Sequence, residues 1–136
     1  MGCTQPDHLL QDLYAARLSG DLDGACRAFA ADAKFQIAGA SETSPVGINA
    51  AGMKEFRPLL ALMIKTFKLG ALTIRTISVE GEHVTVHWEA NVHSRITGAT
   101  VHTEMIDIVE VRDGLIVNFN EVFHPLDRSS NKGGQV

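Results

Sequence analysis

The fold is decided by residues 100–123, TVHTEMIDIVEVRDGLIVNFNEVF. Apolar β-formers alternate with polar residues on both sides of a short connection, RDG. Two alternating runs joined by a few residues that include glycine predict an antiparallel β-hairpin. The first run carries a carboxylate, Asp107, among isoleucines and valines, and the second run carries Glu121. The position of these two acids is the main functional question that the sequence raises.

The same period of two residues extends upstream of this hairpin. Alternation over 72–80 and 83–96, with the short connectors GE and TG, predicts two further long strands. In the first of these the parity of the apolar residues changes, which predicts a β-bulge near residues 75–76. Successive strands with tight turns predict an antiparallel meander.

The first half of the chain has helical periodicity instead. Apolar residues at helical spacing predict helices over 6–20 and 53–67, and Asp21 is a predicted N-cap for a short helix between them. A brief strand is predicted at 33–38, and turn-forming residues over 39–52 predict a loop. Helices followed by an antiparallel sheet predict an α+β domain with its helices on one face. We expect one domain over 1–126 and a disordered polar tail over 127–136.

The alternation also assigns the faces of the strands. Trp88 and the residues at even spacing from it should face the helices, while His87 and His93 should face outward. If TG forms a two-residue turn, Trp88 lies opposite Asp107, and His93 lies opposite His102.

A three-residue turn over RDG places Phe119 opposite Asp107 and makes Glu121 a diagonal neighbour of that acid. Ile106 and Ile108 then point outward. This register predicts two carboxylates in an apolar, aromatic setting on the helix-facing side of the sheet.

Composition restricts the classes of partner. The 136 residues include 12 basic and 16 acidic side chains, a net charge of −4, and no cluster of lysine or arginine. A nucleic-acid partner is therefore not expected. No apolar run reaches the roughly 18 residues of a membrane span, so no membrane partner is predicted. Two cysteines make no disulfide framework, and no secretory signal is visible, so the predicted location is cytoplasmic.

The segments SGDLDGACRAFAADAKF and TEMIDIVEVRDGLIVNFNEVF resemble the NTF2-like superfamily, in particular its SnoaL-like and ketosteroid-isomerase-like branch. The resemblance extends over about residues 7–125. It implies a cystatin-like cone, in which a curved antiparallel sheet wraps around three N-terminal helices and encloses a pocket. It also implies a homodimer formed through the outer face of the sheet. Members of the family include isomerases, polyketide cyclases, epoxide hydrolases, dehydratases and non-catalytic domains.

Two sets of family residues are carried over only in part. Asp107 falls where ketosteroid isomerases keep a protonated aspartic acid. Those enzymes are a standard example of a raised carboxyl pKa. The general-base aspartate of those enzymes aligns with Ile37, and their oxyanion-binding tyrosine aligns with Leu13, one position from Tyr14.

Limonene-type epoxide hydrolases resemble the chain at both acids, Asp107 and Glu121. Their bridging arginine, however, aligns with Met105, and their water-binding tyrosine and asparagine align with Phe35 and Ile37. Neither set of catalytic residues is complete in this chain.

These patterns predict that a small, largely hydrophobic carbonyl-type molecule binds in an apolar pocket. If the protein is an enzyme, Asp107 is the expected proton donor and Glu121 the expected base, with no cofactor, in an isomerisation, cyclisation, dehydration or hydrolysis. The alternatives are that Asp107 is a structural carboxylate bonded to Trp88 or Tyr14, and that the domain binds a ligand or partner without catalysis. The histidine spacing predicts no metal site. The predicted pocket-lining residues are Tyr14, Phe35, Ile37, Phe56, Leu60, Met63, Trp88, Met105, Phe119 and Phe123.

Overall fold

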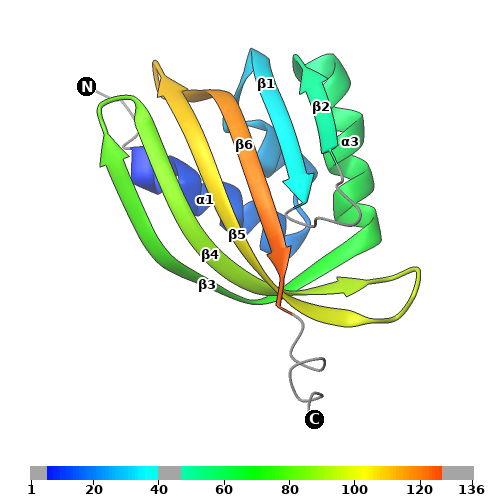
Figure 1. The fold of residues 1–136 in the computed structure, drawn as a ribbon. Coiled ribbons are helices and arrows are strands. Elements are labelled where there is room, and N and C mark those ends of the chain that lie inside the picture. The colour runs from blue at the N-terminus through cyan, green and yellow to red at the C-terminus, as the bar shows by residue number, and fades with distance from the viewer. Residues whose placement is uncertain (1–5, 40–46, 127–136) are drawn as a thin grey trace.

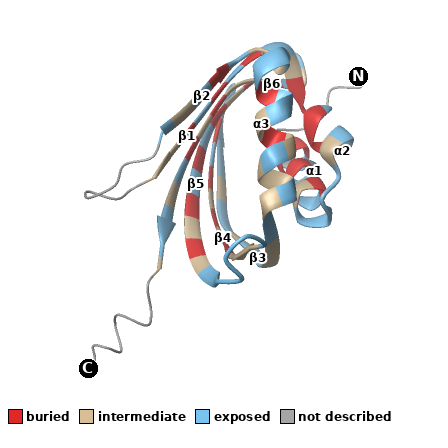
Figure 2. Ribbon diagram, turned by 90° about the vertical axis from the view of Figure 1, so that its right-hand side faces the viewer, coloured by how far each residue is buried: buried red, intermediate tan, exposed pale blue. Residues whose placement is uncertain are grey.

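A computed structural model describes residues 6–39 and 47–126. Three helices lie on one side of a curved six-stranded sheet (Figures 1 and 2). None of the helices in these ranges is long and apolar enough to cross a membrane. The helices are α1 (Pro6–Ser19), α2 (Leu22–Cys26) and α3 (Met53–Thr66). The strands are β1 (Phe29–Gly39), β2 (Gly47–Ala51), β3 (Phe67–Glu80), β4 (His83–Ser94), β5 (Thr100–Arg112) and β6 (Leu115–Pro125).

The α+β class predicted from the sequence is confirmed, but the sheet is mixed and not wholly antiparallel. Its order is β2-β1-β6-β5-β4-β3, and β1 runs parallel to β6. Part of the segment predicted as a loop is the edge strand β2, which pairs antiparallel with β1. Residues 40–46 of that predicted loop, and the tail predicted from 127 onward, lie outside the described residues. The parallel pair was missed because it joins strands from opposite ends of the chain, and no local pattern reports such a pairing.

The concave face of the sheet carries most of the apolar core. Alternate residues of β4 are buried, as predicted, and Trp88 is fully buried. Ile106 and Ile108 point outward and are 41% and 48% exposed, also as predicted. The β3–β4 pairing shifts between Ile74 and Thr76, which confirms the predicted bulge. At one end of the fold four aromatic rings pack on one another with centroids 4.2–5.6 Å apart: Phe29, Phe35, Phe56 and Phe119.

The register between β4 and β5 differs by two residues from the predicted one. Trp88 pairs with Met105, and Asp107 pairs with Val86. The predicted two-residue turn is instead a longer connection, closed where the N–H of Ser94 donates to the carbonyl of Ala99 at 2.9 Å. The connection is longer because Arg95, which alternation assigns to the strand, binds helix α3 instead.

The register between β5 and β6 also differs, and this difference matters for the acids. The turn consists of Asp113 and Gly114, both with positive φ (55° and 77°), the geometry of a tight two-residue hairpin turn. If this register continued, Asp107 would lie opposite the outward-facing Asn120. A bulge in β6 shifts the pairing, so that Asp107 lies directly opposite Glu121. The two acids are therefore direct cross-strand partners. The sequence had predicted that they would be diagonal neighbours.

The turn makes a prediction about stability. Gly114→Ala should lower the free energy of unfolding by about 1–2 kcal/mol, because an L-residue is strained at positive φ. Urea unfolding followed by Trp88 fluorescence would measure the loss. Gly70→Ala is the matched control: Gly70 also lies in the sheet, has no positive φ and has open space where the added methyl group would lie. Equal losses in both variants would contradict this account of the turn.

Candidate functional site

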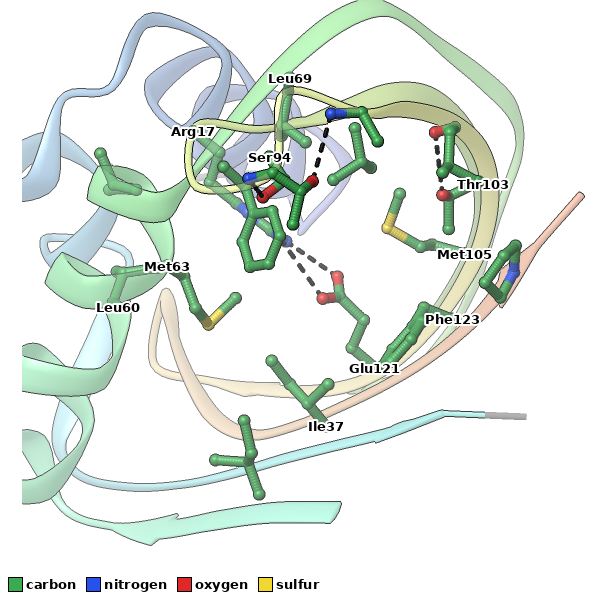
Figure 3. Close-up of a pocket in the computed structure, with 18 residues that line it drawn as sticks. Arg17, Ile37, Leu60, Met63, Leu69, Ser94, Thr103, Met105, Glu121 and Phe123 are labelled. Carbon is green, nitrogen blue, oxygen red and sulfur yellow. Dashed lines mark hydrogen bonds and ion pairs between the residues drawn. The ribbon is translucent and has the colours of Figure 1, made fainter. Parts of the chain in front are cut away.

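A cavity of about 610 Å³ lies between the concave face of the sheet and helix α3 (Figure 3). Leu60 and Met63 approach it from α3, while Met105 and Phe123 approach it from the strands. Almost all of its wall is apolar, and a few hydroxyl groups, such as that of Thr103, add polarity. A cavity of this size and character suits a small hydrophobic molecule.

One ion pair lies at the wall of this cavity, between Arg17 of α1 and Glu121 of β6. Arg17 Nη1 donates to Glu121 Oε2 at 2.8 Å, and Nη2 donates to Oε1 at 3.4 Å, so the contact is bidentate. Their side chains are only 10% and 3% exposed. Among the described lining residues these two alone are charged, and Figure 3 shows both heads directed toward the enclosed space.

Asp107 lies beside this pair but does not line the cavity. It is fully buried, and its Oδ2 accepts two hydrogen bonds, from Tyr14 Oη at 2.5 Å and from Trp88 Nε1 at 2.8 Å. The structural alternative considered for Asp107 is therefore the one observed. The expectation that this acid is exposed at the pocket floor is wrong, because the tyrosine and tryptophan rings, 5.0 Å apart, cover it.

The other oxygen of this carboxyl group indicates where its proton is. Asp107 Oδ1 is buried and has no hydrogen-bond partner among the described residues. Burial raises the pKa of Asp107 well above its ordinary value of 3.8, and the charge of Glu121 raises it further. Once Asp107 is protonated, its contact with the Glu121 side chain becomes a hydrogen bond that the neutral acid donates. The raised pKa favours the neutral form of Asp107, which can donate to Glu121, its direct cross-strand partner.

The neighbouring groups respond to the same charges. Burial by itself would lower the pKa of Arg17, but the charge of Glu121 and its hydrogen bonds raise it, so the guanidinium stays charged. Its Cζ atom lies 5.2 Å from the centroid of the Trp88 ring, close enough for a cation–π contact. Burial and the nearby Asp107 raise the pKa of Tyr14, which keeps its hydroxyl as a donor. With Asp107 neutral, the charges of Arg17 and Glu121 cancel, and the cluster has no net charge.

The structure separates the predicted pocket residues into two groups. Glu121 and five predicted lining residues do line the cavity: Ile37, Leu60, Met63, Met105 and Phe123. The other five are packed in the core and do not line it: Tyr14, Phe35, Phe56, Trp88 and Phe119. They were assigned to the pocket because their parity is correct. Parity gives the face of the sheet but not the depth at which the core closes.

Arg17 is the functional residue that the sequence reasoning missed. It lies three residues after Tyr14, so both side chains leave α1 on the same face, toward the sheet. An arginine on the buried stripe of a helix was the available signal. Arg17 places a guanidinium beside the two acids from helix α1. In the epoxide-hydrolase pattern the arginine instead aligns with Met105, which lies in β5.

His93 and His102 contact polar partners on the outer face of the sheet. Among the described residues, no three or more His, Cys, Asp or Glu side chains are grouped so as to hold a metal ion. His93 pairs with Thr100, and not with His102 as predicted. His102 instead contacts Glu89 at 2.6 Å on the outer face, and Glu89 also accepts from Arg75 Nε at 2.5 Å. These groups form a polar network on the outer face of the sheet, outside the cavity.

Comparisons with known proteins agree with this architecture. Residues 10–119 match the model of the SnoaL-like domain, and no curated protein matches the chain. A Bacillus subtilis protein described as a proposed isomerase superposes with a TM-score of 0.75 at 23% identity, over 94% of this chain and 92% of that one. A Catenulispora acidiphila protein of ketosteroid-isomerase-like fold, solved with trimethylamine, has a TM-score of 0.71 at 18% identity, over 87% and 85%. An NTF2-like protein of unknown function from Cytophaga hutchinsonii has a TM-score of 0.63 at 14% identity, over 90% and 94%.

Proposed function

The chain belongs to the SnoaL-like domain family, and from this premise and the site geometry we propose that its cavity binds a small, largely hydrophobic carbonyl compound. The observation that carries the proposal is the single charged position in a largely apolar wall, where Arg17 and Glu121 meet among the described lining residues. A ligand that fills the cavity would place one polar group against this pair and its hydrocarbon part against the remaining wall. A few convergent polar groups in an apolar cavity are the usual basis of ligand orientation.

The charges of the site favour an uncharged ligand. Arg17 and Glu121 already neutralise each other, and burial and the charge of Glu121 raise the pKa of Asp107, which favours its neutral form. A charged ligand would therefore bring an uncompensated charge into a largely apolar cavity, which is costly. A neutral carbonyl group avoids this cost and can still accept a hydrogen bond from an Arg17 N–H group.

The same contacts support acid–base chemistry, with roles that differ from those expected from the sequence. Glu121 lines the cavity and is the base; Arg17, and not Asp107, donates to the carbonyl oxygen. Glu121 takes a proton from the carbon next to the carbonyl, and the C–H electron pair forms an enolate whose oxygen faces the guanidinium. Where the ligand has a carbon–carbon double bond at its β,γ positions, this enolate is a dienolate, and return of the proton from Glu121 to the γ-carbon gives the conjugated isomer. One structural neighbour is described as a proposed isomerase, which agrees with this reaction type.

Asp107 acts in this scheme as a positioning residue, because it does not touch the ligand. Its neutral carboxyl group donates to Glu121 and is itself held by Tyr14 and Trp88. The second candidate function, binding without catalysis, is favoured by the same contacts. Each acid is already engaged by groups of the protein, and Glu121 is held by a bidentate ion pair.

The two candidates are separated by proton exchange at a carbonyl compound. The probe is 2-tetralone, a neutral bicyclic ketone with acidic C–H groups, followed by proton NMR in D₂O. We expect the protein to accelerate the loss of the α-proton signal, and Glu121→Gln to reduce this rate at least about 100-fold. The matched control is Glu110→Gln, which removes a carboxylate from the same hairpin on the outer face.

Binding is measured in parallel with Nile red, a neutral dye whose fluorescence rises in apolar surroundings. Dye binding without any accelerated exchange would support the non-catalytic module. An absence of dye binding by the folded protein, or equal exchange rates in wild type and Glu121→Gln, would contradict the catalytic proposal.

A further inference from the structure

The cavity reaches the surface where three large apolar side chains are exposed. Phe67 at the start of β3, Ile96 in the β4–β5 connection and Val101 in β5 are 42%, 79% and 40% exposed. We call these three residues the mouth rim. Phe67 and Val101 also line the cavity, so the rim is continuous with the apolar interior.

The rim is held in place by the helix behind it. The N–H of Arg95 donates to the carbonyl of Thr66 at 2.8 Å, and its Nη1 donates to the carbonyls of Ile64 and Lys65 at 2.8 and 3.1 Å. These carbonyl groups belong to the last turn of α3, where carbonyl groups have no hydrogen-bond donor within the helix itself. The β4–β5 connection, which contains Ile96, is therefore held beside the junction of α3 and β3 by the contacts of Arg95. Figures 1 and 2 show the connection at this end of the sheet.

The segments of the chain that carry the rim are basic, although the whole chain is acidic. The net charge is −4, yet residues 56–79 and 90–103, which include the rim, contain no aspartate or glutamate. Within them Lys65 and Lys68 lie next to the rim in the chain and are exposed. An exposed aliphatic tip with a basic surround is the composition of surfaces that bind anionic lipid headgroups.

We propose that the mouth rim is a docking surface for an anionic lipid membrane. Ile96 enters the headgroup region, while Lys65 and Lys68 contact the negative lipid headgroups. The cavity mouth then faces the bilayer, and an apolar molecule can pass between bilayer and cavity without crossing water. The sequence predicted no membrane partner because it lacks an apolar run long enough to span a bilayer. Peripheral binding needs no such run.

The lipid surface is favoured over an acidic protein by the form of the rim. Three separated apolar side chains around an opening, with few charges, suit a fluid surface that adapts to them. A protein partner would instead need a preformed surface whose shape is complementary to the three separated side chains. Docking itself can be tested without a ligand in the cavity, so its failure is distinct from failure of the proposed function.

The experiment is co-sedimentation of the whole chain with vesicles. Vesicles of phosphatidylcholine alone are compared with vesicles that contain phosphatidylserine, at low and at physiological ionic strength. We expect binding only to the anionic vesicles, and weaker binding as salt is raised. Lys65→Gln with Lys68→Gln should weaken it about 25-fold, at about fivefold per charge. Ile96→Ser should weaken it about tenfold, through lost apolar insertion.

Matched controls are Lys34→Gln and Val79→Ser, exposed residues of the same types on other parts of the sheet. They should bind anionic vesicles like the wild type. Thermal unfolding of every variant verifies that the fold is retained. Equal losses in rim and control variants would overturn the proposal. An absence of binding at low ionic strength would also overturn it, and would leave an acidic protein as the partner for the basic surround.

Discussion

Arg17→Met should reduce the free energy of unfolding by about 3–5 kcal/mol at neutral pH. The variant leaves Glu121, whose side chain is 3% exposed, as a buried carboxylate without its cation. Methionine retains most of the apolar contacts of the arginine stem, so the loss reports the missing charge and hydrogen bonds. Urea unfolding at pH 7 measures it.

Two further variants identify the origin of this loss. Arg17→Met combined with Glu121→Gln should recover most of the stability, because neither charge is then buried alone. The control is Arg57→Met, which breaks an ion pair with Asp23 whose side chains are 48% and 69% exposed. Because both groups of that pair are exposed to solvent, Arg57→Met should lose much less stability than Arg17→Met. Similar losses in Arg17→Met and Arg57→Met, or a double variant as unstable as the single one, would contradict the assigned role of the buried pair.

The second large effect is expected at Asp107. Asp107→Ala should cost about 3–5 kcal/mol, because Tyr14 Oη and Trp88 Nε1 both lose their acceptor inside the core. Asp107→Asn should cost far less, since the amide oxygen still accepts from both donors and the amide N–H can donate to Glu121. A small cost for alanine would show that the two hydrogen bonds contribute little to stability.

The asparagine variant also tests where the proton is. The pKa of Asp107 is raised in the folded protein, so the native state holds a proton that the unfolded chain releases above its ordinary pKa of 3.8. The stability that this group contributes is therefore complete at low pH and is lost as pH rises toward the raised pKa. Relative to Asp107→Asn, the wild type should lose up to about 1.4 kcal/mol per pH unit over that window. A stability difference that is independent of pH would mean that Asp107 is ionised in the native state.

Much of the fold followed from local pattern. The helices predicted over 6–20 and 53–67 are observed as Pro6–Ser19 and Met53–Thr66, and β3 to β6 were identified as strands. Of β1, only residues 33–38 were predicted. Side-chain periodicity reports which surface of an element is buried, whatever that surface packs against. The same reasoning placed Asp107 and Glu121 on the helix-facing side of the sheet, where both are buried.

Register followed less well, because turns depend on what the rest of the chain offers them. The β4–β5 connection is longer than predicted because the last turn of α3 binds Arg95. On the other hairpin a tight turn and a bulge together shift the pairing by two residues. Each register differs from the predicted one by two residues, so the buried face is the same but the partner of Asp107 is different. Alternation cannot detect a shift of two residues, because side chains on a strand alternate with a period of two.

Periodicity thus reported which side chains face the core, and the motif residues reported the family, both from information between near neighbours in the chain. The chemistry of the site required the folded arrangement. Arg17, Asp107 and Glu121 come from three elements, and no pattern in the sequence joins Arg17 to Glu121, which follows it at a separation of 104 positions. Whether an acid lines a cavity or is covered by Tyr14 and Trp88 depends on packing depth, a property of several elements at once. For this reason the alternation gave the face of both acids, but not that Glu121 lines the cavity while Asp107 lies beneath Tyr14 and Trp88.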